Sequence, residues 1–159
     1  MRRLIFLALL PGFLLLAACG GEAEKPSGPG GAEGGAQQAA GELEAQGERI
    51  SVSGGSYTRV PPSAFRALSE QEGVTLVNTH VPFQGKLPRT DLFIPYSEIG
   101  ERVDELPKEK DAKIALYCLG GPMSADAAET LVGLGYTNVW DLGGGMEAWR
   151  EAGLPLEGA

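Results

Sequence analysis

The hydrophobic pattern of the chain has three parts: an apolar start, a polar stretch, and a longer part in which short apolar runs alternate with helical periodicity. Runs of apolar and β-branched residues in the last part predict strands, because such runs suit a sheet that is covered on both faces. These strands are expected at residues 57–60, 74–77, 91–94, 113–117 and 138–142. The first of them is expected at the edge of the sheet.

Helical patterns lie between the predicted strands. A helix is expected to begin at Pro61-Pro62 and to bury Phe65. Residues 96–106 predict a second helix, which stops before Pro107. A third helix is predicted before Gly135 from apolar residues at helical spacing, which are Met123, Ala127, Leu131 and Leu134. A last helix is predicted before Gly153, with Met146 and Trp149 as its apolar residues. The alternation predicts an α/β fold with a mainly parallel central sheet, flanked by helices on both faces.

Residues 1–18 have the pattern of a secretory signal, with a basic start and an apolar run shorter than the roughly 20 residues of a membrane span. The run ends in Leu16-Ala17-Ala18-Cys19-Gly20, which resembles the lipobox of bacterial lipoproteins. That resemblance implies lipidation of Cys19 and attachment to a membrane by several acyl chains. The expected location is therefore extracytoplasmic, either periplasmic or at the cell surface, and an ordinary signal peptide is the alternative.

Residues 19–49 predict a flexible tether, because they are rich in small and polar residues and contain little that a core would bury. Residues 50–159 are the predicted folded domain. The 21 acidic residues outnumber the 13 basic ones, which makes nucleic acid an unsuitable partner, since phosphates are repelled. A single histidine, His80, and two cysteines in separate contexts predict no metal site and no disulfide.

Cys118 is the candidate nucleophile, because it follows a predicted buried strand and precedes a glycine-rich loop and a helix. Such a loop is expected to aim several backbone N–H groups at the sulfur, which favours the thiolate, the nucleophilic form of the side chain. His80 follows another strand and is a candidate for the same edge of the sheet, where ligands of parallel sheets bind. A small buried cysteine and a structural histidine are the alternatives.

Residues 74–78 and 113–156 resemble the rhodanese-like family. That family pairs an early strand with a later strand that ends in the active cysteine, and it closes with the pattern Leu-Gly-Tyr-x-x-Val-x-x-Leu-x-Gly-Gly-x-x-x-Trp. This chain has every residue of the closing pattern, from Leu134 to Trp149. The resemblance implies a rhodanese-like fold and transfer of sulfane sulfur through a persulfide on Cys118, with no cofactor. It implies a small sulfur donor and a thiol acceptor as partners, and substrate contacts from Leu119, Gly120, Gly121, Met123, Ser124 and His80.

The loop departs from the family pattern in its charge. Leu119 and Met123 stand where the family commonly has arginine, which should weaken binding of thiosulfate-like anions. Asn78 replaces the usual aspartate of the early strand, and Lys86 or Arg89 is a candidate for the missing positive charge. Ser124 stands where a related phosphatase needs arginine, so phosphate ester hydrolysis is not expected. A module without turnover, which binds a protein partner or senses redox state or sulfur, is the second hypothesis.

Overall fold

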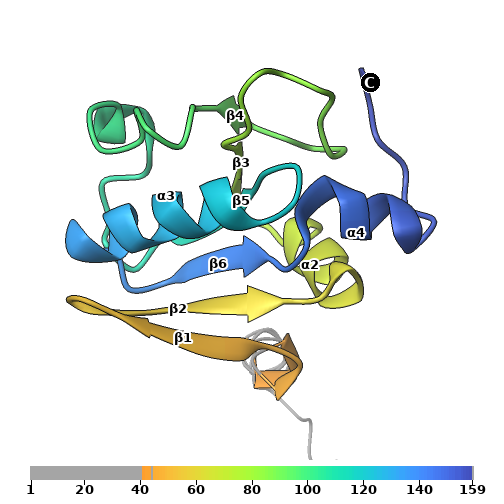
Figure 1. Cartoon of the computed structure of the whole chain (residues 1–159). Helices are drawn as coiled ribbons and strands as arrows, with labels where there is room; N and C mark the ends of the chain where they lie inside the picture. Colours follow the sequence, from red (N-terminus) through yellow and green to blue (C-terminus); the bar gives the residue numbers. More distant parts are fainter. Residues whose placement is uncertain (1–40, 44, 159) are drawn as a thin grey trace, which may run out of the picture. The chain divides into compact units, whose positions relative to one another are not determined.

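The computed structural model describes residues 41–43 and 45–158 (Figure 1). The predicted signal segment 1–18, Cys19 and most of the predicted tether lie outside the described residues. Within the described part, no helix is long and apolar enough to cross a bilayer.

A six-stranded sheet forms the centre of the folded part, in the order β1-β2-β6-β5-β3-β4. The strands are β1 (Glu48–Val52), β2 (Gly55–Val60), β3 (Val74–Asn78), β4 (Leu92–Phe93), β5 (Lys113–Tyr117) and β6 (Val139–Leu142). Only the β1–β2 pair is antiparallel. The prediction of a mainly parallel sheet is confirmed.

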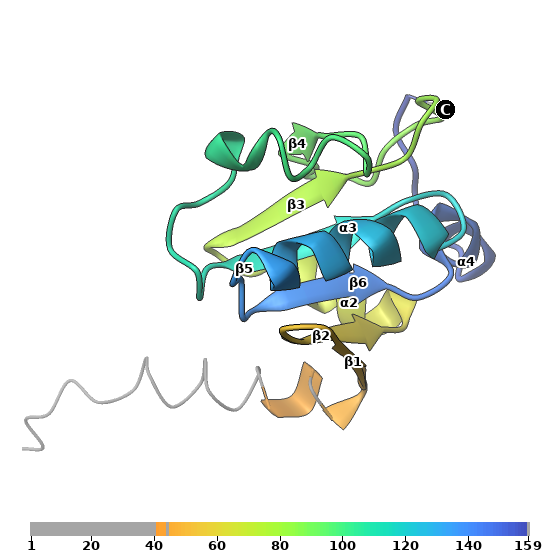
Figure 2. The ribbon, with the colours of Figure 1, turned by 60° about the vertical axis from the view of Figure 1, so that its left-hand side comes forward.

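Helices cover both faces of this sheet. They are α2 (Pro62–Ser69), α3 (Pro122–Gly133) and α4 (Gly145–Glu151). Figure 2 shows α3 in front of β5 and β6 and α2 behind the sheet. The faces are separated by the alternation of side chains along each strand. In β5, Ile114 and Leu116 join the cluster under α3, whereas Ala115 and Tyr117 join the cluster under α2 and α4.

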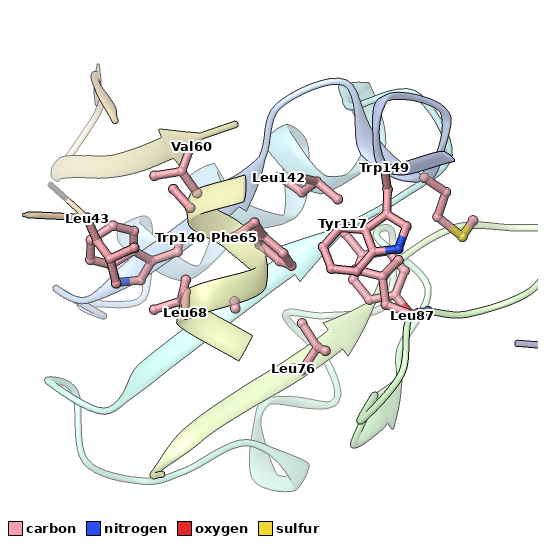
Figure 3. Close-up of a cluster of buried hydrophobic side chains, with 13 residues drawn as sticks. Leu43, Val60, Phe65, Leu68, Leu76, Leu87, Tyr117, Trp140, Leu142 and Trp149 are labelled. Carbon is pink, nitrogen blue, oxygen red and sulfur yellow. The ribbon is translucent and has the colours of Figure 1, made fainter. Parts of the chain in front are cut away.

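Phe65 is central to the cluster under α2 and α4 (Figure 3). Its ring meets Tyr117 and Trp149 edge to face, with ring centroids 6.5 and 6.4 Å apart. Trp140 belongs to the same cluster, so both tryptophans are core residues. This packing fixes β5 between the two layers and thereby fixes the position of the residue that follows it, Cys118.

The boundary of the predicted tether differs from the structure. Residues 41–43 are helical, the Leu43 side chain is only 4% exposed in the cluster under α2 and α4, and β1 already begins at Glu48. Strand β1 also displaces β2 from the edge of the sheet, where it was expected. Leu43 and the short edge strand β1 complete the fold of the domain, although the polar composition of this segment predicted a tether.

Two further expectations were wrong. Residues 96–106 form turns and one short 3₁₀ helix, η1 (Val103–Glu105), and Gly100 in the middle of this segment disfavours a continuous helix. Leu134 is 42% exposed, because α3 ends at Gly133 before the predicted apolar stripe is complete.

We expect Leu43→Ala to lower the free energy of unfolding by about 2 kcal/mol or more, since a buried leucine is replaced by a smaller side chain. Leu134→Ala is the matched control, and it should change stability by less than about 0.5 kcal/mol, because that leucine is exposed. Urea unfolding of both variants measures the difference. Equal effects would show that Leu43 does not belong to the core.

Candidate active site

Cys118 lies at the carboxyl end of β5, between that strand and the start of α3 at Pro122. The loop between them is held by the beginning of α4. The N–H of Met146 bonds the Cys118 carbonyl at 2.9 Å, and the N–H of Glu147 bonds the Leu119 carbonyl at 3.0 Å. A Cβ atom on Gly145 would lie 2.5 Å from both carbonyl oxygens. Glycine is therefore required at this position for the loop to be held so closely.

The Cys118 sulfur accepts one backbone hydrogen bond, from the N–H of Gly121 at 3.0 Å. The Ser124 hydroxyl lies 3.5 Å from the same sulfur. The expected set of several amides is thus reduced to one N–H and one hydroxyl among the described residues, partly because Pro122 has no N–H. Cys118 is only 1% exposed, so the surrounding residues cover it almost completely.

Ser124 connects the sulfur to a buried ion pair that the sequence reasoning missed. Its Oγ lies 2.6 Å from Oδ1 of Asp141, and Oδ2 of Asp141 accepts a bond from Nε of Arg59 at 2.9 Å. Nη2 of Arg59 also donates to the Tyr57 hydroxyl at 2.9 Å. The signal for this pair was an acidic residue inside the otherwise apolar strand β6, since a buried charge needs a partner.

The two members of the ion pair differ in burial, because Asp141 is fully buried whereas the Arg59 side chain is 34% exposed. Burial raises the pKa of Asp141, and the bonds from Ser124 and Arg59 offset only part of that rise. Burial alone would lower the pKa of Arg59, but the hydrogen bond and charge of Asp141 raise it. Arg59 therefore stays charged, and Asp141 is the member of the pair whose protonation is more readily changed.

A cavity of about 260 Å³ lies beside the cysteine loop. Its walls are Arg59, Gly120, Gly121, Pro122, Ala125 and Gly144. Of the predicted substrate contacts, the structure places Gly120 and Gly121 on this cavity and Ser124 on the sulfur. Leu119 instead packs against the core under α2 and α4. Met123 is half-buried at the start of α3.

His80 is 5% exposed, and no hydrogen bond joins it to Cys118 in the described part of the chain. Its backbone N–H bonds Asn78, and its Nε2 lies 3.0 Å from the Gln84 amide nitrogen. Its Nδ1 is buried without a partner among the described atoms. Burial lowers the pKa of His80, which favours the neutral ring. A role for His80 in the reaction remains a prediction.

The candidates for the missing positive charge do not lie on the cavity beside the loop. Lys86 pairs with Glu157 at 3.6 Å, and Arg89 lines a separate cavity with Trp149. A carboxylate approaches the loop instead, because a Cβ on Gly120 would lie 3.2 Å from Oε2 of Glu147. Arg59 is thus the cation on this cavity, and its charge is shared with Asp141.

Comparisons with known proteins identify relatives of this chain. Residues 74–152 match the rhodanese-like domain family. The chain is 36% identical to a sulfurtransferase of Allochromatium vinosum, over 59% of this chain and 88% of that protein. It is 31% identical to the thiosulfate sulfurtransferase GlpE of Pseudomonas syringae pv. syringae, over 59% and 88% of the two chains.

A solved structure gives the same result. The crystal structure of a rhodanese-related protein from Thermoplasma volcanium is 31% identical to this chain and superposes with a TM-score of 0.53, over 62% of this chain and 95% of that one. The cysteine at the end of a central parallel strand, the loop held by α4 and these relatives lead to one conclusion: the chain belongs to the rhodanese-like family.

Proposed function

We propose that this chain transfers sulfane sulfur through a persulfide on Cys118. Its sulfurtransferase relatives support a sulfur-transfer role in general. The observation that carries the proposal is the N–H of Gly121 aimed at the Cys118 sulfur from 3.0 Å, at the start of α3. A backbone N–H at a helix start favours negative charge, and both the thiolate and the persulfide anion are negative.

The reaction has two half-reactions. The Cys118 thiolate attacks the outer sulfur of the donor, so a new S–S bond forms and the donor's own bond to that sulfur breaks. The donor's remainder leaves with the electron pair of the broken bond. An acceptor thiolate then attacks the outer sulfur of the Cys118 persulfide and carries it away. Cys118 leaves as the thiolate, so neither half-reaction needs an external oxidant.

The charges around the loop favour a donor of low charge. Arg59 is bonded to Asp141, and the Glu147 carboxylate lies close to Gly120. A dianion such as thiosulfate would meet one shared cation and a nearby carboxylate, whereas family members with loop arginines offer it charged hydrogen bonds. The reacting S–S group of an organic persulfide carries at most one negative charge, so we propose organic persulfides as the preferred donors.

A mass experiment tests the proposed reaction. The full-length chain is incubated with glutathione persulfide, polysulfide or thiosulfate, and its intact mass is measured over time. The C19A variant should gain the mass of one sulfur atom, which dithiothreitol removes, and Cys118→Ser in the C19A background should gain none. Mass gain from thiosulfate should be at least about tenfold slower than mass gain from the persulfide. The reason is that thiosulfate lacks the charged hydrogen bond of a loop arginine, which is worth about 1.5–3 kcal/mol.

The C19A variant controls for the second cysteine. Absence of added sulfur with all three donors would contradict a sulfurtransferase. That outcome would favour the second candidate function, a rhodanese-fold module that binds a partner or senses redox state or sulfur. The near-complete burial of Cys118 is the observation that favours this second candidate.

We also propose that lipid chains on Cys19 anchor the protein to the extracytoplasmic side of a membrane. The support is the lipobox-like sequence that ends at Cys19. The acidic composition supports a covalent anchor as well, because a net charge of −8 does not favour binding to anionic headgroups.

Metabolic labelling with an alkyne fatty acid in a bacterial host tests the anchor. The wild type and Cys118→Ser should carry the label and sediment with membranes. Cys19→Ala should carry no label and leave the membrane fraction, because its thiol is the expected acylation site. A labelled Cys19→Ala protein, or an unlabelled wild type, would refute the assignment.

A further inference from the structure

The ion pair of Asp141 and Arg59 is joined to Cys118 through the hydroxyl group of Ser124. Three acceptors surround the Ser124 hydroxyl: Oδ1 of Asp141 at 2.6 Å, the Gly121 carbonyl at 3.0 Å and the Cys118 sulfur at 3.5 Å. A serine hydroxyl has one hydrogen and can donate to one of them at a time. Both Ser124 and Asp141 are fully buried, so water does not supply a second donor at their surfaces.

The distances decide where this hydrogen lies when Asp141 is ionised. A separation of 2.6 Å is typical of a hydroxyl that donates to a carboxylate, whereas 3.5 Å to sulfur is a weak contact. Ser124 then presents only lone pairs to Cys118, and these favour the protonated thiol. If Asp141 is protonated, its own hydroxyl donates to Ser124, and the serine hydrogen is free to donate to the sulfur.

The charges of the cluster also favour a protonated Asp141 when the Cys118 sulfur is anionic. Among the contacts described for this part of the chain, the cation bonded to the cluster is Arg59, and Asp141 and Cys118 are groups in it that can become anions. Two like charges in a buried site oppose each other, and one guanidinium balances one of them. The arginine-free loop supplies no second positive charge, since Leu119 and Met123 stand where the family commonly has arginine.

We propose that Cys118 and Asp141 share one proton through Ser124, so that Asp141 is protonated whenever the sulfur is anionic. Asp141 is a positioning residue in this scheme, because it acts on the reacting sulfur through Ser124. The persulfide step rests on the proposed function, whereas the shared proton does not. The raised pKa of Asp141, caused by its burial, agrees with a carboxyl that takes up a proton.

The proton is conserved through both half-reactions. It passes from the Cys118 thiol to Ser124, while the serine hydrogen passes to Asp141. The thiolate then attacks the donor, and the negative charge resides on the outer persulfide sulfur while Asp141 keeps the proton. When an acceptor thiolate removes that sulfur, the Cys118 thiolate is released and recovers the proton by the reverse path. The persulfide anion is thus balanced by Arg59, whose partner has become neutral.

Other charged groups are near but do not bond the shared hydrogen. Tyr57 on β2 bonds Arg59, and Asp126 and Glu129 of α3 act on Tyr57 through their charge. Glu147 of α4 lies near Gly120 on the other side of the loop. Asp126 is exposed and belongs to the same helix as Ser124, so it provides a matched control for the removal of one negative charge.

The test is the pH dependence of Cys118 alkylation by iodoacetamide, followed by intact mass in the full-length C19A background. Asp141→Asn imitates the protonated carboxyl. In this variant the pH midpoint of the Cys118 alkylation rate should fall by about one pH unit or more. At a pH below the midpoint, alkylation should therefore be about tenfold faster than in the protein with Asp141. Asp126→Asn should leave the midpoint unchanged. In a Ser124→Ala background, Asp141→Asn should have a smaller effect, because the hydrogen-bonded bridge is already absent.

A measurement without a variant at Asp141 covers the case in which Asp141→Asn does not fold. The ¹³C shift of the Asp141 carboxyl carbon should show two titration steps when Cys118 is present, and one step in Cys118→Ala. An unchanged or raised midpoint in Asp141→Asn, or the same single step in both proteins, would overturn the shared proton. Neither measurement uses a sulfur donor, so its failure is distinct from failure of the proposed sulfur transfer.

Discussion

The site depends on one close approach of backbone to backbone. The start of α4 donates two N–H groups to the carbonyls of Cys118 and Leu119, and only glycine at position 145 leaves room for that contact. The contact turns the loop so that the N–H of Gly121 meets the sulfur. It also connects the nucleophile to α4, whose Trp149 is packed on Phe65 in the core. The position of one sulfur atom is therefore set by the packing of the whole layer under α2 and α4.

Within this frame, the source of positive charge differs from the family pattern. The loop itself carries no arginine, and the cation on the cavity comes from β2, a strand that is distant in sequence from Cys118. Arg59 is linked to the sulfur through Asp141 and Ser124. A proton on Asp141, in place of a loop arginine, then governs how much positive charge the sulfur experiences. This arrangement suits donors that bring little charge of their own.

The parallel sheet, the strand that ends at Cys118 and the glycine-rich loop could be predicted from the sequence, because apolar runs and glycines act locally. An acidic residue within an apolar strand signals that Asp141 needs a partner, but Arg59 could not be predicted as that partner, since the pair depends on β2 and β6 becoming neighbours. The burial of Leu43 was also missed, because the residues around it are polar and give no sign that this side chain enters the core. Residues 96–106 do not form the expected helix, and Gly100 in the middle of this segment disfavours one.

The central claim is that the Gly121 N–H stabilises negative charge on the sulfur of Cys118. The most direct measurement is the amide proton shift of Gly121 by NMR as the persulfide forms. We expect the Gly121 amide proton to move downfield in step with the gain of sulfur, because its acceptor becomes an anion. A protein that gains sulfur on Cys118 while the Gly121 amide stays unchanged would contradict it.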